Sequence, residues 1–264
     1  MVKMIQDMKE MKMKQKAPVL EVINNNPWYT ADQLAAAKGH QIRAIQRRYT
    51  YILHSIKDYL KSHDGEPIRV LDAGCGDGVQ LQLLTQIPEV VVWGADYNPL
   101  RARRARQNFP TVHIVCCDLL HLPFPPAFFD IILCSQVIEH IPQDDLLLER
   151  FANALKPRGL LILGTPNEGC FMARLRNHIF ERRILRNTDH VHFYTELGIR
   201  CKLKAAGFAI QQIMRENWFF PHQLINNYLA NCNWGFHLVG WLRAIIPSQT
   251  AGYYFQCVKG LSKK

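Results

Sequence analysis

The stretch VLDAGCGDG, residues 70–78, decides the fold, because a run of apolar residues passes through an acid into a glycine-rich turn. Glycine lets the backbone adopt a positive φ and lets a ligand approach the main chain closely. In open α/β sheets a ligand lies beyond the carboxyl ends of the strands, where such a turn stands. The glycines of this turn are spaced as GxGxG, which differs from the GxGxxG of dinucleotide-binding domains.

Two acids accompany the glycine turn: Asp72 precedes it and Asp77 lies within it. A dinucleotide would bring a pyrophosphate dianion to the start of the following helix, and two nearby carboxylates would repel it. The same carboxylates suit a ligand with positive charge. S-adenosylmethionine carries a sulfonium and an ammonium group and no phosphate, so the turn favours this ligand over a dinucleotide.

Short β-rich runs alternate with helical segments along the chain. Their apolar residues are nearly continuous, which is typical of strands covered on both faces. The expected strands are 68–73, 90–96, 112–117, 129–135, 159–165, 207–217 and 251–260. The expected helices are one or two within 31–62, then 78–87, 99–109, 143–155, 166–186 and 195–206. This alternation predicts an α/β fold with a doubly wound parallel sheet.

Composition fits one ordinary folded domain, with 264 residues, 48% hydrophobic and 20% charged. We expect residues 1–30 to be a flexible tail without a secretory signal, and 31–264 to form a single domain. The eight cysteines form no CxxC pair, which argues against a disulfide framework or a zinc site and predicts a cytoplasmic protein. No stretch reaches the ~20 apolar residues that span a bilayer. The net charge of +10 favours an anionic partner or serves solubility alone.

Polar side chains also follow the next three expected strands. Asp96 ends the second strand, where a carboxylate can accept both ribose hydroxyls, and Asp118 follows the third, where with Leu119 it can bracket adenine. Ser135 and Gln136 follow the fourth strand at the far side of the same cleft. Acids at three successive strand ends are more specific than the glycine motif alone.

The ordered stretches VLDAGCGDG, GADYNP, CCDLLHLPFPPAFFDIILCSQVIEHI and LKPRGLLILGTPN resemble the motifs of class I S-adenosylmethionine-dependent methyltransferases. The chain is particularly similar to the type 11/23 group, which includes the ubiquinone-pathway O-methyltransferases. This resemblance covers roughly residues 45–215 and the terminal strand. It implies a Rossmann-like seven-stranded sheet with an antiparallel last strand, and S-adenosyl-L-methionine as the cofactor. The cofactor-binding residues that it implies are Asp72, Gly74, Cys75, Gly76 and Gly78 on the methionine side, Asp96 and Tyr97 at the ribose, Asp118 and Leu119 at the adenine, with Ser135 and Gln136 beyond.

Catalytic candidates lie in SQVIEHI, just after the fourth strand. Methyl transfer works mainly by orientation, but a hydroxyl acceptor must also lose a proton. His140, with Glu139 beside it, is the candidate for that task; the alternative is that both residues only brace the following helix. Related enzymes acting on small-RNA 3′ ends carry ExxEH here and hold a divalent ion. Because Gln136 replaces the first carboxylate, we expect no metal, although His190 and His192 follow in DHVHFYT.

Two segments outside the shared motifs bear on the acceptor. Residues 173–186 carry five arginines among apolar residues, and match either a membrane-surface helix, an anion-binding rim or a solvated helix. Residues 218–250 form an aromatic-rich insertion, readable as a lid, an interfacial segment or plain core. We therefore expect a small-molecule acceptor, apolar or lipid-linked, that is methylated at oxygen, and peripheral contact of the protein with a membrane. The alternative is an RNA-directed methyltransferase of the ExxEH type, although no RNA-binding appendage is recognisable. The sequence does not fix the oligomeric state.

Overall fold

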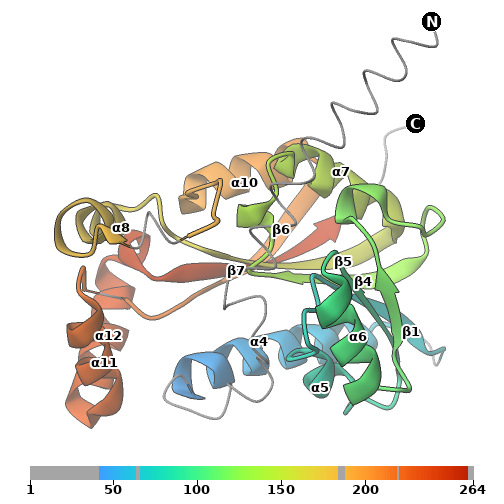
Figure 1. Cartoon of the computed structure of the whole chain (residues 1–264), viewed down its shortest axis with the longest axis horizontal. Coiled ribbons are helices and arrows are strands. Elements are labelled where there is room, and N and C mark those ends of the chain that lie inside the picture. The colour runs from blue at the N-terminus through green and yellow to red at the C-terminus, as the bar shows by residue number, and fades with distance from the viewer. Residues whose placement is uncertain (1–41, 64–65, 184–187, 219, 261–264) are drawn as a thin grey trace, which may run out of the picture.

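The protein is described here from a computed structural model, which covers residues 42–63, 66–183, 188–218 and 220–260 (Figure 1). The expected flexible tail, residues 1–30, lies outside these ranges, as does the first part of the expected leading helices. Within them, one long helix, α4 (Ile42–Leu60), precedes the sheet. No helix among the described residues combines the length and the apolar character that crossing a bilayer requires.

A seven-stranded sheet forms the centre of the molecule, in the order β3-β2-β1-β4-β5-β7-β6. Six strands run parallel and β7 is antiparallel to both of its neighbours, β5 and β6. The doubly wound, Rossmann-like sheet with an antiparallel last strand is therefore confirmed. The strands are β1 (Ile68–Ala73), β2 (Val90–Asp96), β3 (His113–Cys116), β4 (Phe129–Ser135), β5 (Leu155–Pro166), β6 (Phe208–Arg215) and β7 (Gly252–Lys259).

Helices cover both faces of this sheet, which explains the near-continuous apolar runs of the strands (Figure 1). One face is covered by α4, α5 (Leu81–Leu84) and α6 (Pro99–Asn108), and the other by α7 (Asp144–Ala154) and α10 (Glu196–Ala205). On the first face Ile52 and Ile56 of α4 pack against Val70 and Ile131. On the second, Phe151 of α7 packs in the other main core cluster. Both cores hold β1 and β4 at the middle of the molecule.

Three expected elements differ from the structure. The helix expected over 78–87 shortens to Leu81–Leu84. The strand expected at 159–165 begins earlier, at Leu155, with a register shift against β4 and a positive φ at Arg158. The helix expected over 166–186 is wrong in its first turn, because β5 continues to Pro166 and α8 (Phe171–Leu175) begins only at Phe171. The Asn167 and Gly169 amides donate to the Ala251 and Tyr194 carbonyls at 2.9 and 2.8 Å, so the backbone here is bonded to neighbouring segments and not within a helix.

The aromatic insertion folds as two helices, α11 (Gln223–Asn231) and α12 (Asn233–Ile245). With α8 and the π-helical turn η3 (Arg176–Phe180), they occupy one end of the molecule (Figure 1). Trp218, Leu229 and Val239 form a small core of their own there. A bridge between Trp218 and Thr250 closes the base of the insertion, and η4 (Pro247–Gln249) leads back into β7.

Candidate active site

The glycine turn after β1 has the conformation that its sequence predicts. Gly74, Gly76 and Gly78 have φ of 83°, 54° and 100°, values that other residues rarely adopt. A Cβ added at Gly74 would lie 2.3 Å from a methyl group of Val137, and one at Gly78 would lie 2.5 Å from the ring of Phe109. The turn is therefore wedged between the loop after β4 and the end of α6.

Asp96, at the end of β2, is the residue that fixes this turn. Its Oδ2 accepts a hydrogen bond from the Gly76 amide and its Oδ1 accepts one from the Asn98 amide, both at 2.8 Å. The side chain is 8% exposed. Burial raises the pKa of Asp96, and the two amide hydrogen bonds oppose that rise. The carboxylate at the predicted ribose position thus stands at the same edge as the glycine turn.

Asp72 is the least satisfied group of the turn. It is completely buried, and neither carboxyl oxygen has a hydrogen-bond partner among the described residues. Burial, followed by the charge of Asp96, raises the pKa of Asp72 to about 8. A buried carboxyl without partners is costly in a folded protein. This group therefore fits a cationic ligand that would supply the missing interaction.

Asp77, in contrast, lies next to two arginines. It is fully buried, and its oxygens lie 3.9 Å from Arg101 Nε and 3.7 Å from Arg104 Nη1, both on α6. Its charge is balanced inside the protein and braces the turn against that helix. Of the two acids of the turn, Asp72 is therefore the one whose charge is not balanced by arginine, and the expectation that both attract a cationic ligand holds more strongly for Asp72.

The other predicted cofactor residues have different surroundings. Cys75 is 4% exposed, and its sulfur would lie 3.0 Å from a Cβ added at Gly94, so it faces the core and offers the ligand only its backbone. Asp118 caps the turn η1 (Leu119–His121) by accepting from the Leu120 amide, while Leu119 is buried and Tyr97 is half-buried. The Ser135 hydroxyl is 2.6 Å from the Tyr254 hydroxyl on β7.

Gln136 is strained and incompletely bonded. Its φ is +58°, and its backbone amide donates to the Gly164 carbonyl at 2.9 Å. Its side-chain Nε2 is buried and has no hydrogen-bond partner in the part of the chain that the structure describes. Strained backbone of this kind concentrates at functional sites, because surrounding structure must maintain it. Its contact with a cofactor stays a prediction.

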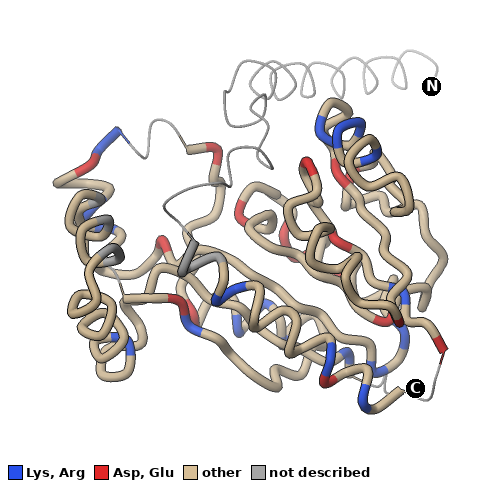
Figure 2. The backbone as a smooth tube through the Cα atoms, turned by 90° about the horizontal axis from the view of Figure 1, so that it is seen from below, with Lys and Arg blue, Asp and Glu red and all other residues tan. Residues whose placement is uncertain are grey.

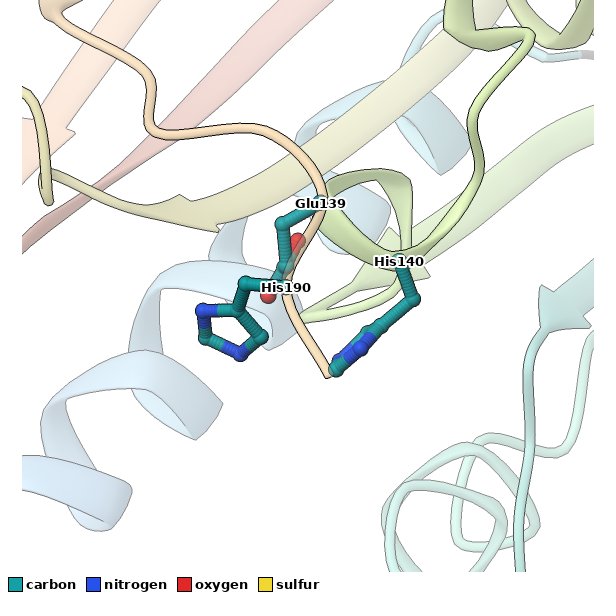
Figure 3. Close-up of side chains that lie close together, drawn as sticks. All are labelled: Glu139, His140 and His190. Atoms are coloured by element: carbon teal, nitrogen blue, oxygen red, sulfur yellow. The ribbon is translucent and has the colours of Figure 1, made fainter. Parts of the chain in front are cut away.

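Glu139, His140 and His190 come together beside this loop (Figure 3). One potential ligand atom from each lies within 4.8 Å of the others. Glu139 and His140 belong to the 3₁₀ turn η2 (Ile138–His140), whereas His190 comes from the segment before α10. The Glu139 carbonyl accepts from the Val191 and His192 amides at 2.9 and 3.1 Å, which holds that segment against η2. The rings of His140 and His190 meet edge to face at 4.6 Å.

These three side chains have strongly perturbed protonation. Burial, followed by the charge of His190, lowers the pKa of His140 to about 4, so its imidazole is neutral at pH 7. Burial raises the pKa of Glu139 to about 7. Burial alone would lower the pKa of His190, but the carboxylate of Glu168, 2.5 Å away, raises it. Such clustering of groups with shifted pKa values is typical of an active site.

Three neighbours of this cluster were not predicted from the sequence. Asp189 Oδ1 lies 3.1 Å from His140 Nδ1, Glu168 binds His190, and the Thr165 hydroxyl donates to Glu139 Oε2 at 3.2 Å. Thr165 and Glu168 stand at and just after the end of β5, within LGTPNEG. The position of Thr165 and Glu168 at the end of a strand was the signal that could have identified them, since the same reasoning identified Asp96 and Asp118. For Asp189 the sequence offered no signal other than its position next to His190.

The cluster also offers donors that a divalent ion could use. Glu139 Oε1 is buried and has no hydrogen-bond partner among the described residues, and neutral His140 is in the ligating state. His190 is already engaged by Glu168, and Gln136 supplies an amide where a carboxylate would add charge. These residues fit a weak cation site at best. Methyl transfer without a metal therefore stays our prediction.

A separate cavity of about 490 Å³ lies between the end of β5, α10 and η4. Asn167, Thr195, Arg200 and Tyr253 are among the residues that line it. None of the residues predicted to bind the cofactor or to act in catalysis lines this cavity. It is distinct from the edge formed by β1, β2 and β4.

The turn, the acids at the strand ends and the sheet order together define a class I S-adenosylmethionine-dependent methyltransferase. Residues 42–213 match the family model described as a methyltransferase domain, so the chain belongs to that family. The identification made from the motifs, including the enzyme class and its cofactor, is thereby confirmed.

Among its curated relatives, the chain is 32% identical over 163 residues to the malonyl-[acyl-carrier protein] O-methyltransferase of Herminiimonas arsenicoxydans, with 61% of this chain and 60% of that protein covered. It is 29% identical over 127 residues to the ubiquinone biosynthesis O-methyltransferase of Neisseria meningitidis, covering 44% of this chain and 53% of that protein. The chain thus spans little more than half the length of these relatives.

Among solved structures, the fold is similar to the phosphoethanolamine N-methyltransferase 2 of Haemonchus contortus in complex with S-adenosyl-L-methionine. The TM-score is 0.55 at 20% identity, covering 79% of this chain and 52% of that one. At this identity the likeness shows the fold alone.

Proposed function

We propose that this chain transfers the methyl group of S-adenosylmethionine to an oxygen of a small, apolar or lipid-linked acceptor. The observation that carries this proposal is the His140 imidazole, which is neutral at pH 7, lies next to Asp189, and belongs to the loop whose Val137 packs against Gly74. A neutral imidazole can accept a proton, which an oxygen nucleophile must lose and a tertiary amine does not.

In the proposed reaction the acceptor oxygen attacks the methyl carbon, the carbon–sulfur bond breaks, and S-adenosylhomocysteine leaves. Asp72 faces a positively charged part of the donor, and Asp96 accepts from its ribose hydroxyls. His140 takes the acceptor proton, and the imidazolium that forms is attracted by the carboxylate of Asp189, 3.1 Å from its Nδ1. Glu139, held by Thr165 and by the backbone of 191–192, keeps η2 in place.

The relatives support oxygen as the methylated atom. Two of them are named as O-methyltransferases, one acting on malonyl-[acyl-carrier protein] and one in ubiquinone biosynthesis. An apolar acceptor is supported by the aromatic insertion, in which Trp234 and Trp241 are about 60% exposed. Exposed apolar area of this extent is unusual unless it contacts another molecule.

The test is labelling of a cell extract with S-adenosylmethionine that carries a radioactive methyl group, followed by separation into lipid, RNA, protein and small-metabolite fractions. We expect label in the lipid or small-metabolite fraction when the purified natural chain is added. This label should be absent when the His140→Ala variant is added instead. Label confined to protein or RNA would refute the acceptor class. Base stability of the product then separates ethers from esters.

An RNA-directed methyltransferase of the metal-assisted ExxEH type is the second candidate. The one observation in its favour is the cluster of Glu139, His140 and His190. Against it stands Gln136, which cannot neutralise a cation. Label in the RNA fraction that disappears with chelator and returns with a divalent ion would establish this alternative.

A further inference from the structure

The end of the molecule formed by α8, η3, α11 and α12 exposes large apolar side chains. They include Leu224, Tyr228, Trp234, Trp241, Ile245 and Phe180, each 54–71% accessible. We call this group the end surface. Single exposed apolar residues are ordinary on proteins, but a contiguous group marks a contact site.

The end surface is not the packing face of α12. Gly235 and Val239 of that helix are buried, the latter in the small core with Trp218 and Leu229. Trp234, Trp241 and Ile245 are spaced by seven and four residues, so they share one helix face, which is rotated away from the buried one. The helix therefore has two apolar faces, and only one of them is covered within the described residues.

The exposed side chains are continuous between elements. The rings of Tyr228 on α11 and Trp234 on α12 lie 6.2 Å apart. Phe180 of η3 lies 6.4 Å from His222, the residue that caps the start of α11. The end surface thus extends from η3 across α11 to α12, and all of it lies at one end of the molecule (Figure 1).

Positive charge accompanies this apolar surface. The described residues 169–183 and 220–249 contain five arginines and one acid, Glu181. Arg174, Arg182 and Arg183 among them are exposed. Figure 2 shows this end with blue segments and little red. Aromatic residues beside cationic ones suit the boundary between lipid headgroups and acyl chains, where the rings enter and the arginines meet phosphate.

We propose that the end surface binds to the face of a membrane that contains anionic phospholipid. This goes beyond methyl transfer, and it depends neither on the acceptor nor on the donor. A second copy docked through the same surface would bring the exposed Arg174, Arg182 and Arg183 of both copies to one interface, which like-charge repulsion opposes. Residues 1–30 of the chain are also net positive, with five lysines and three acids, and so do not complement it.

The experiment is sedimentation of the full chain with vesicles of phosphatidylcholine, alone or with 30% phosphatidylglycerol, without either substrate. We expect roughly tenfold stronger binding to the anionic vesicles, decreasing with salt. The double variant Trp234→Ser, Trp241→Ser should lose roughly tenfold or more of this binding. Leu197→Ser, which removes a 72% exposed apolar side chain from α10, should bind as the natural chain does.

Circular dichroism verifies that the double variant is folded. Equal binding to both vesicle types, or undiminished binding of the double variant, would overturn the proposal. So would a dimer in analytical ultracentrifugation that the double variant abolishes, because the surface would then join two copies. Label transfer in the extract experiment is measured separately, so failure here leaves the proposed methyl transfer standing.

Discussion

Replacing Asp72 with Asn should stabilise the ligand-free protein while weakening its hold on S-adenosylmethionine. Asp72 is fully buried without partners, and its pKa rises from an ordinary 3.8 to about 8. In the unfolded chain this carboxyl ionises near pH 4, whereas in the folded chain it keeps its proton until about pH 8. The free energy of unfolding therefore decreases as pH rises between these two values.

The cost follows from the size of that shift. One pKa unit corresponds to about 1.4 kcal/mol. The raised pKa of Asp72 therefore lowers the free energy of unfolding by about 4 kcal/mol at pH 7 and by about 2 kcal/mol at pH 5. Asn has nearly the same shape and cannot ionise, so the variant avoids this cost. The expected gain at pH 7 is a rise of roughly 1 M in the urea midpoint.

The assay is urea unfolding without ligand at pH 5, 7 and 8, together with calorimetric titration of the donor. The difference in stability between the Asn variant and the natural chain should grow with pH, while donor affinity falls roughly 10- to 100-fold. Asp96→Asn is the matched control and should lose stability, because Asp96 accepts two backbone hydrogen bonds. A difference that stays constant from pH 5 to pH 8 would refute the reasoning about Asp72.

Three further predictions concern the same edge of the sheet. His140→Ala should lower kcat roughly 100- to 10,000-fold with donor affinity unchanged. His54→Ala, at an exposed position on α4, should leave both kcat and donor affinity unchanged, and equal kcat for the two variants would exclude His140 as the base. Dialysis against a chelator should leave activity intact, and activity that is lost and then restored by a divalent ion would contradict a metal-free reaction. Gly78→Ala should cost roughly 1–3 kcal/mol in urea unfolding, because φ is +100° and the Phe109 ring blocks the Cβ, whereas Gly240→Ala, where nothing lies within 4 Å, should cost nothing.

The sheet could be predicted from the sequence because its central strands, such as β1 and β4, are buried on both faces. Their apolar runs and the turns after them follow directly from local sequence, and so do the glycine turn and Asp96. The helix expected over 166–186 begins late, at Phe171, because the Asn167 and Gly169 amides bond to Ala251 and Tyr194, which are distant in the sequence. Helical spacing alone cannot reveal such a contact.

The candidate site was predictable only where it follows strands. His140 pairs with Asp189, nearly fifty residues later, and this contact depends on how 189–192 hydrogen-bonds to Glu139. Asp77 also shows the limit of reading charge from sequence: it seemed to face the ligand, but its carboxylate lies near Arg101 and Arg104 instead. The direction of a side chain in a turn depends on the backbone, which composition does not specify.

The central claim is that S-adenosylmethionine binds where Asp96 and the glycine turn meet. Titration calorimetry of the donor into the natural chain and into Asp96→Ala tests it most directly, with circular dichroism to verify folding of the variant. We expect saturable binding to the natural chain and an affinity lower by roughly tenfold or more in the variant. Equal affinity in both, with the variant folded, would contradict it.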